Sequence, residues 1–186
     1  DIYLRDTQAN TTAWVSVDAN GLQADGASRN PSVSGDGRYV AFESDATDID
    51  AGDDNGLTDI YLRDTQANTT AWISMNSQGF AANGASTRPA ISGDGLWVVF
   101  VSLATDLVST DTNGGVADIF LHDVMGGTTT RLSDGPLSSP LDEADGSSDR
   151  PVLSTDGSAV AFESLATNLV TGDGNGVSDI FFDTLP

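Results

Sequence analysis

Acidic and amide side chains recur three times in one spacing that could bind a metal ion. Each copy has an Asp, an Asn two residues later, a Gly directly after the Asn, and a second Asp four or five residues beyond the Asn. Calcium takes about six to eight oxygen ligands from carboxylates, side-chain amides, backbone carbonyls and water, and a Gly lets such a loop curl around the ion. We therefore predict Ca²⁺ as the cofactor. The predicted ligands are Asp53, Asn55 and Asp59; Asp111, Asn113 and Asp118; and Asp173, Asn175 and Asp179.

The segments 53–59, 111–118 and 173–179 are called the first, second and third DxNG loops. Around the first loop, five carboxylates lie within twelve residues, and no basic residue follows until Arg63. Carboxylates this close repel one another unless a cation or salt offsets them, which favours a metal site. The alternative is that Asp and Asn form Asx turns and Gly takes a positive φ, so that the loops are ordinary connections. Additional candidate ligands lie upstream, at Asp48, Asp106 and Asn168.

The composition excludes several functional classes. The chain has 186 residues, with 28 acidic residues against 7 basic ones and a net charge of −21. All seven basic residues are Arg, and 25 of the acids are Asp, which favours turns, rather than Glu, which favours helices. Without a basic stripe the chain cannot displace the counterions of a nucleic acid, so we predict no nucleic-acid partner. The expected partner is a cation or a basic protein surface.

No catalytic constellation stands out, and we predict that the protein is not an enzyme. The chain has no Cys, no Gly-x-Ser-x-Gly motif and a single histidine, His122, which is expected at the surface. Glu43 and Glu163 could form the carboxylate pair of a glycosidase. They occupy equivalent positions in two copies of a repeat, however, which favours ion pairing or packing.

Arginine and tryptophan also recur at equivalent positions. We expect Arg29, Arg88 and Arg150 to form structural ion pairs with acidic loop residues. Trp14 and Trp72 are equivalent residues of a predicted outer strand, and Arg131 falls at or beside their position in the next repeat. These Trp side chains are expected to pack at the outer edge, and stacking on a sugar is the alternative.

An internal repeat supplies the elements that must position these residues. The segment Asp1–Asp6 recurs, with changes, from Asp59, Asp118 and Asp179, at intervals of 58, 59 and 61 residues. Repeats are predicted at about 1–58, 59–117 and 118–178, with 179–186 starting a further strand, within a single domain or fragment covering 1–186.

Each repeat is predicted to form four short strands. A Ser-Gly-Asp-Gly or Ser-Thr-Asp-Gly turn connects the first two, and Asp-Gly between apolar runs is a strong hairpin signal. The predicted strands lie around 32–34, 90–92 and 152–154; at 39–44, 97–102 and 159–164; at the Asp-Ile-Tyr/Phe runs; and at 12–17, 70–75 and 128–132. Four antiparallel strands in a radial repeat are typical of a propeller blade. We therefore predict an all-β fold, a β-propeller of four-stranded antiparallel blades with about three blade repeats of ~60 residues.

The strand order has two consequences. Connections in an up-and-down blade alternate between two faces, so the DxNG loops and the connections between repeats should share one acidic face. The order also gives two complete and two partial blades, whereas propellers close with about 4–8. We expect a processed chain or a piece of a longer one, or association between copies through open blade edges. No apolar run approaches the ~18–20 residues of a membrane helix, so no membrane span is predicted.

The repeats resemble a known family. The order Arg/Asn-Pro-x-Val/Ile-Ser-x-Asp-Gly-x-x-Val-x-Phe-x-Ser, then Asp-x-Asn-Gly, then Asp-Ile-Phe-Leu-x-Asp, is similar to the WD40-like (PD40) repeats of TolB-type β-propellers, particularly in secreted bacterial proteins. The resemblance implies a propeller that serves as a periplasmic binding scaffold or as a non-catalytic gating domain beside a hydrolase. The chain departs from the pattern at an extra Gly115 and in a longer connection at 133–149.

These observations favour one function over two alternatives. The leading hypothesis is a non-enzymatic, calcium-binding β-propeller scaffold or interaction module of a secreted or cell-surface bacterial protein, located outside the cell, on its surface or in the periplasm. The first alternative is a ligand-binding or gating propeller attached to a hydrolase. The second is a self-assembling surface or filament subunit, which the partial blades suggest.

Overall fold

The fold consists of β-sheets that follow one another along the chain. The computed structural model describes residues 1–109, 111–135 and 143–185. Its sheets are β1-β2, β3-β4-β5-β6, β7-β8-β9-β10 and β11-β12-β13, and every neighbouring pair is antiparallel. The bounds are β1 Tyr3–Asp6, β2 Thr11–Trp14, β3 Ser28–Val33, β4 Tyr39–Ser44, β5 Asp59–Asp64, β6 Thr69–Trp72, β7 Ser86–Ile91, β8 Trp97–Ser102, β9 Asp118–Asp123, β10 Thr128–Arg131, β11 Ser148–Leu153, β12 Ala159–Ser164 and β13 Asp179–Thr184.

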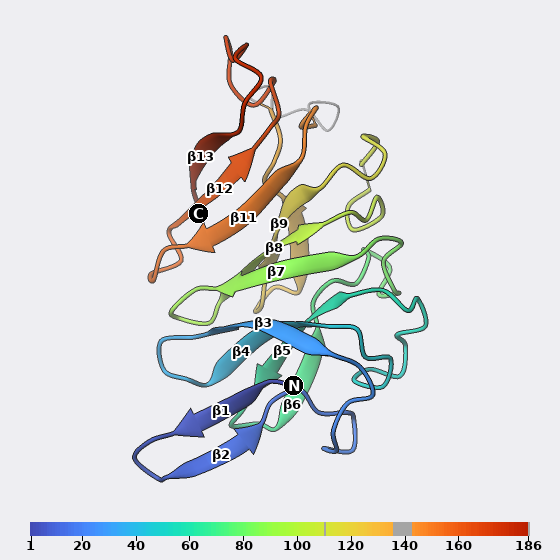
Figure 1. The fold of residues 1–186 in the computed structure, drawn as a ribbon, viewed down its shortest axis with the longest axis vertical. Coiled ribbons are helices and arrows are strands. Elements are labelled where there is room, and N and C mark those ends of the chain that lie inside the picture. Colours follow the sequence, from blue (N-terminus) through green and yellow to red (C-terminus); the bar gives the residue numbers. More distant parts are fainter. Residues whose placement is uncertain (110, 136–142, 186) are drawn as a thin grey trace.

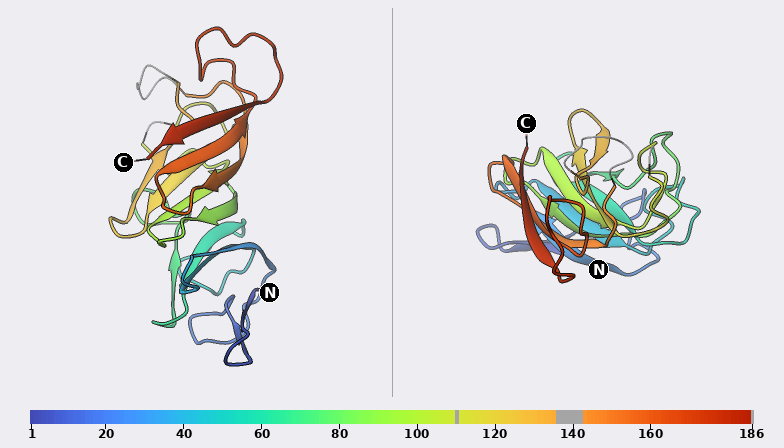
Figure 2. Two further views of the ribbon diagram at one scale, coloured as in Figure 1. Left: turned by 90° about the vertical axis from the view of Figure 1, so that its left-hand side faces the viewer. Right: turned by 90° about the horizontal axis from the view of Figure 1, so that it is seen from above.

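The sheets are stacked face to face as the blades of an open propeller segment (Figure 1). We call β3–β6 blade 1, β7–β10 blade 2 and β11–β13 blade 3. The β1-β2 hairpin and β13 lie at opposite ends of the stack, which Figure 2 also shows. This arrangement confirms the predicted all-β propeller fold, with two complete blades between two partial ones.

The hydrophobic core lies between the blades. On one face of blade 1, Ile60 and Leu62 pack against Val98 and Phe100 of blade 2 in a single cluster of buried side chains. A second cluster joins β1 to blade 1, and a third joins blade 2 to blade 3. The inner strands of blades 1 and 2 therefore carry apolar residues on both faces, because these two sheets are covered on both sides, whereas the end sheets leave side chains such as Ile180 and Phe182 exposed.

The first strand of each blade begins earlier than predicted. It starts at Ser28 rather than near Ser32, because a bulge accommodates the proline that cannot donate to the ladder. The residue before each proline has a positive φ of 50–55°, at Asn30, Arg88 and Arg150. The register shifts at the same point in all three blades.

The outer strands end earlier than predicted, for a different reason. β6 ends at Trp72 rather than near Met75, because the backbone amide of Ile60 in β5 bonds to the Ser74 hydroxyl at 2.9 Å instead of a backbone carbonyl. Ser16 and Ser133 accept the equivalent bonds from Ile2 and Ile119. A side chain thus replaces the last rung of the ladder.

Within the described residues, no helix is long and apolar enough to cross a membrane.

Candidate functional site

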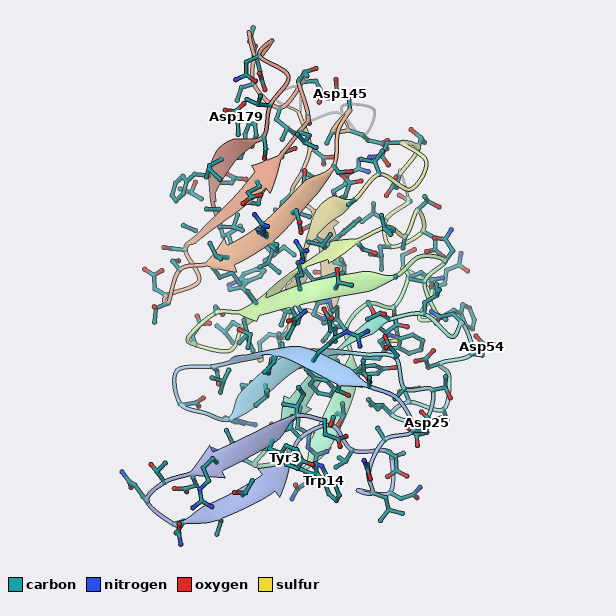
Figure 3. The ribbon with its side chains drawn as sticks, in the orientation of Figure 1. Tyr3, Trp14, Asp25, Asp54, Asp145 and Asp179 are labelled. Atoms are coloured by element: carbon teal, nitrogen blue, oxygen red, sulfur yellow. The ribbon has the colours of Figure 1, made fainter. Side chains whose placement is uncertain are left out.

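The DxNG loops lie beside the connections between blades. In Figure 1 the tight β3–β4 and β7–β8 turns point to the left and the long connections to the right. Figure 3 shows Asp25 and Asp54 on that same right-hand side. The backbone amide of Asp25 donates to Asp48 Oδ1 at 3.0 Å, and Asp25 in turn accepts from the amide of Thr47 at 2.8 Å. The prediction that both kinds of connection share one face is confirmed.

These reciprocal bonds recur in every blade and were not anticipated. Asn83 exchanges bonds with Thr105 and Asp106, and Asp145 does so with Thr167 and Asn168. The proposed additional ligands Asp48, Asp106 and Asn168 therefore have a structural role in holding two connections together. The signal was present in the repeated Asp/Asn-Gly-Ala/Ser-Ser and Ala-Thr-Asp/Asn segments.

The first DxNG loop buries two carboxylates. Asp59 is fully buried, and its Oδ1 accepts from the Ser74 hydroxyl at 2.5 Å while its Oδ2 accepts from Asn55 Nδ2 at 3.2 Å. Asn55 Nδ2 also donates to the Ala82 carbonyl of the next connection at 3.1 Å, and its Oδ1 accepts from the Leu57 amide. The loop is thereby fixed to Ser74, just after β6, and to the connection that follows.

Asp53 is the carboxylate of this loop with an unused oxygen. It is 5% exposed, and its Oδ2 accepts from the Tyr61 hydroxyl at 2.6 Å. Its Oδ1 is buried without a hydrogen bond of normal geometry to any described residue, although the Asn55 backbone amide is near enough to act on the carboxylate. Burial raises the pKa values of Asp53 and Asp59, and of the Tyr61 hydroxyl.

The second DxNG loop follows the same plan with other partners. Asp118 is fully buried and accepts from Ser133 at 2.5 Å and from Asn113 Nδ2 at 2.8 Å. Two acceptors, Asp111 Oδ1 and Asn113 Oδ1, are buried without a hydrogen bond to a described residue. Phe120 replaces Tyr61 and has no hydroxyl to donate to Asp111, and Arg131 Nη1 lies 3.7 Å from Asp111 Oδ1. Burial raises the pKa values of Asp111 and Asp118 as well.

The third DxNG loop is more exposed. Asn175 Nδ2 donates to Asp179 Oδ2 at 3.3 Å, and Asn175 Oδ1 accepts from the Val177 amide at 2.9 Å. Asp173, Asn175 and Asp179 line one surface pocket of about 530 Å³. Asp179 lies at the upper end of the molecule in Figure 3.

The structure thus brings each predicted set of three residues together within its own loop. Among the described residues, no three acidic, His or Cys side chains are grouped as a ready-made metal site. An ion in these loops would depend on two carboxylates, amide oxygens and backbone carbonyls, which is within the range that Ca²⁺ accepts. Calcium binding remains a prediction.

The predicted ion pairs of the three recurring arginines are present, but most of their partners lie in strands and not in the acidic loops: Glu43 is in β4, Asp149 in β11 and Glu163 in β12. Arg29 contacts Glu43 at 3.0 Å and Asp45 at 2.6 Å, and Arg150 contacts Glu163 at 2.8 Å. Arg88 pairs with Asp149 of the next blade, and its backbone amide donates to Glu43. Glu43 and Glu163 are therefore ion-pairing residues, as the repeat pattern predicted.

The remaining candidates also have structural partners. Trp72 is buried and stacks on Tyr61 with 6.1 Å between ring centroids, whereas Trp14 is 43% exposed and stacks on Tyr3. His122 is half-buried rather than at the surface, because Thr129 of the adjacent strand contacts its Nδ1 at 3.0 Å. Burial lowers the pKa of the imidazole.

Comparisons with known proteins give the fold and little more. No protein-family model matches the chain, and no curated protein matches its sequence. TolB from Acinetobacter baumannii superposes with a TM-score of 0.51 at 19% identity, over 96% of this chain and 36% of TolB. The tricorn protease gives 0.56 at 12% identity over 97% of this chain and 15% of the protease. A prolyl endopeptidase superposes with a TM-score of 0.57 at 18% identity, over 98% of this chain and 24% of the endopeptidase.

These likenesses support the resemblance to TolB-type propellers at the level of fold. The chain spans about a third of the length of TolB and a smaller share of the two peptidases. The molecule is a β-propeller module, and the propellers that it is similar to occur both in TolB and in enzymes.

Proposed function

We propose that the chain is a non-enzymatic, calcium-binding β-propeller scaffold or interaction module of a secreted or cell-surface bacterial protein. The observation that carries the proposal is the buried Oδ1 of Asp53, which accepts no hydrogen bond of normal geometry from the described residues and lies near a second, fully buried carboxylate at Asp59. An unpaired buried acceptor costs about 1–3 kcal/mol, and more if it is charged. A bound cation would supply the missing partner.

The charges around the first DxNG loop support a cation in particular. The carboxylates of Asp50 and Asp54 repel the negative charge of Asp53, and Asp53 in turn repels the charge of Asp59. Within the described residues, no arginine forms an ion pair with any of these four carboxylates. A divalent ion would therefore offset several repulsions at one place.

The donor types favour calcium over transition metals. The loops offer carboxylate, amide and backbone oxygens, and the chain has no Cys. Hard oxygen donors suit Ca²⁺, whereas thiolate and imidazole suit zinc and copper. Calcium at millimolar concentration is a property of the extracellular space, so this proposal also includes a location outside the cytosol.

The scaffold role follows from where the loops lie. The first two loops contact the following connection, Asn55 at the Ala82 carbonyl and Asn113 at the Ala144 carbonyl. An ion in the loop would therefore stiffen the acidic face as a whole and leave it presented to a basic partner.

The test replaces one buried oxygen ligand and measures thermal stability with and without the ion. Asp53→Asn keeps the size of the side chain and an oxygen for Tyr61 but removes the charge. In about 2 mM CaCl₂, a concentration suited to extracellular sites, the wild type should melt several degrees higher than in chelator. The variant should lose most of this rise.

Asp36→Asn is the matched control. It removes the same charge, but Asp36 lies in the β3–β4 turn on the opposite face. It should keep the calcium-dependent rise. A NaCl solution of equal ionic strength separates binding from screening. If Asp53→Asn lowered the melting temperature equally in calcium and in chelator, the loops would be ordinary turns.

A further inference from the structure

The side chains that pack behind the DxNG loop differ between the two complete blades. In blade 1 this place is apolar, and Trp72, Met75 and Ala81 fill it. The register identifies their counterparts in blade 2. Trp72 pairs with Tyr61 as Arg131 pairs with Phe120, and the bridge Met75–Ala81 corresponds to Asp134–Glu143. An apolar set in blade 1 is thus replaced by an arginine and two carboxylates in blade 2.

Arg131 is a buried cation at the centre of this cluster. Only 3% of its side chain is exposed. Its Nε donates to Asp134 Oδ1 at 2.6 Å, and its Nη1 lies 3.3 Å from Glu143 Oε1 and 3.7 Å from Asp111 Oδ1. The guanidinium therefore joins the first ligand position of the second DxNG loop to the connection that follows blade 2.

Glu143 completes the link from the other side. Its carboxylate accepts from the backbone amide of Thr112 at 2.8 Å and from the Thr112 hydroxyl at 3.1 Å. Thr112 occupies the position of Asp54 in the first loop, so one carboxylate has been removed there. Within the described residues, the second loop is held by a guanidinium and by the Thr112–Glu143 hydrogen bonds, whereas the first loop has no arginine partner and carries the carboxylate of Asp54 at the position of Thr112.

We propose that Arg131 is a built-in cation of the second DxNG loop and makes this loop a weaker calcium site than the first. The inference rests on the proposed calcium function. A guanidinium within 4 Å of Asp111 repels a second cation there, and it competes for the carboxylate oxygens that the ion needs. Among the described residues, no arginine forms an ion pair with the first loop, which is backed by Trp72. Calcium dependence is therefore graded between equivalent loops of one chain.

The experiment compares equivalent Asp residues with and without the arginine. Asp53→Asn and Asp111→Asn are made in the full chain, each in the wild-type and the Arg131→Gln background, and calcium is titrated by calorimetry. In the wild-type background, Asp53→Asn should remove the tighter binding event and Asp111→Asn should leave it unchanged. In the Arg131→Gln background a second event should tighten by about tenfold or more, and Asp111→Asn should then abolish it.

Arg150→Gln is the matched control, because Arg150 is exposed and pairs with Glu163 in another blade. It should leave the titration as in the wild type. If Arg131→Gln fails to fold, the combined Arg131→Trp, Asp134→Met and Glu143→Ala variant transplants the blade 1 set. Its second loop should bind calcium about as tightly as the first.

The outcomes separate the two proposals. Equal effects of Asp53→Asn and Asp111→Asn in the wild-type background, or no second event after Arg131→Gln, would overturn the role of Arg131 and leave calcium binding intact. Absence of binding in the wild type would refute the proposed function. Binding that appears only after Arg131→Gln would show that Arg131 blocks the second loop, but it would overturn the claim that the first loop is the tighter site.

Discussion

Individual hydrogen bonds and ion pairs stabilise the many carboxylates of this chain. Most of the buried carboxylates accept from named donors, as Asp59 does from Ser74 and Asn55. Exposed ones form Asx turns or ion pairs, and the buried Asp64 does both. It accepts from the backbone amides of Gln66 and Ala67, and it pairs with Arg38 at 2.6 Å. An acid with so many donors is stabilised in its charged form.

The Asp64 pair predicts a pH-dependent difference in stability. The hydrogen bond from Arg38, with those of Ala67 and Gln66, lowers the pKa of Asp64 to about 2. Because this pKa lies below the unfolded value of ~3.9, the stabilisation is present above pH ~4 and disappears as the pH falls towards 2. Asp64→Asn should therefore cost about 1 kcal/mol at pH 7, a modest value because Arg38 is partly exposed.

Urea denaturation of both proteins between pH 7 and pH 2.5 checks this prediction. The difference in unfolding free energy should shrink steadily below pH 4. A difference that is constant with pH would mean that the charge of Asp64 is not responsible.

At the scale of the elements, the connections on the acidic face depend on close backbone contact. The reciprocal bonds between Asn83 and Thr105 form only if the backbones of these two segments are in contact. Gly84 makes this possible, because a Cβ there would lie 2.5 Å from the backbone nitrogen of Ala104. Gly26 and Gly146 have the same role in the neighbouring blades. The connection between blades is therefore packed against the loop after the second strand.

Gly84→Ala should accordingly destabilise the protein by about 2–4 kcal/mol, because the added methyl group forces two backbones apart. Gly174→Ala is the control, since its Cβ would meet nothing within 4 Å and its φ is not positive. It should change stability by less than about 0.5 kcal/mol. Denaturant titration of the pair measures the contrast, and similar losses in both variants would argue against the contact.

The whole molecule is held together between blades as well as within them. Besides the apolar clusters, the turns after the first strands bond in sequence, Gly35 to Gly93 and Gly93 to Thr155, both at 2.8 Å. Arg88 adds bonds to Glu43 on one side and Asp149 on the other. In a repeat architecture the total stability is roughly the sum of the blades and of these interfaces.

Gly93→Ala should weaken the interface between blades 2 and 3. Its Cβ would lie 2.5 Å from the Thr155 carbonyl, whereas a Cβ at Gly35 would lie 3.0 Å from the Gly93 carbonyl. We expect Gly93→Ala to cost about 2–3 kcal/mol and Gly35→Ala about half as much. Hydrogen exchange should show lost protection in blade 3 for Gly93→Ala, and uniform loss over all blades would contradict a local interface effect.

The sequence by itself determined the repeat, the strand order and the shared face of the loops. These features depend on local signals, because an Asp-Gly turn or an alternating strand needs only its near neighbours. The residues of each DxNG loop could also be grouped in advance, since they lie within eight positions of one another. The fold and the location of the candidate site were therefore predictable.

Only the tertiary structure decided what each buried group contacts. Ser74 serves Asp59 across fifteen residues, and Glu143 reaches Thr112 across thirty-one, so their roles depend on how blades and connections pack. Arg131 could be placed at the Trp position from the sequence, but its carboxylate partners could not. The energy of a buried charge depends on its surroundings in three dimensions, and a linear pattern carries no information about that environment.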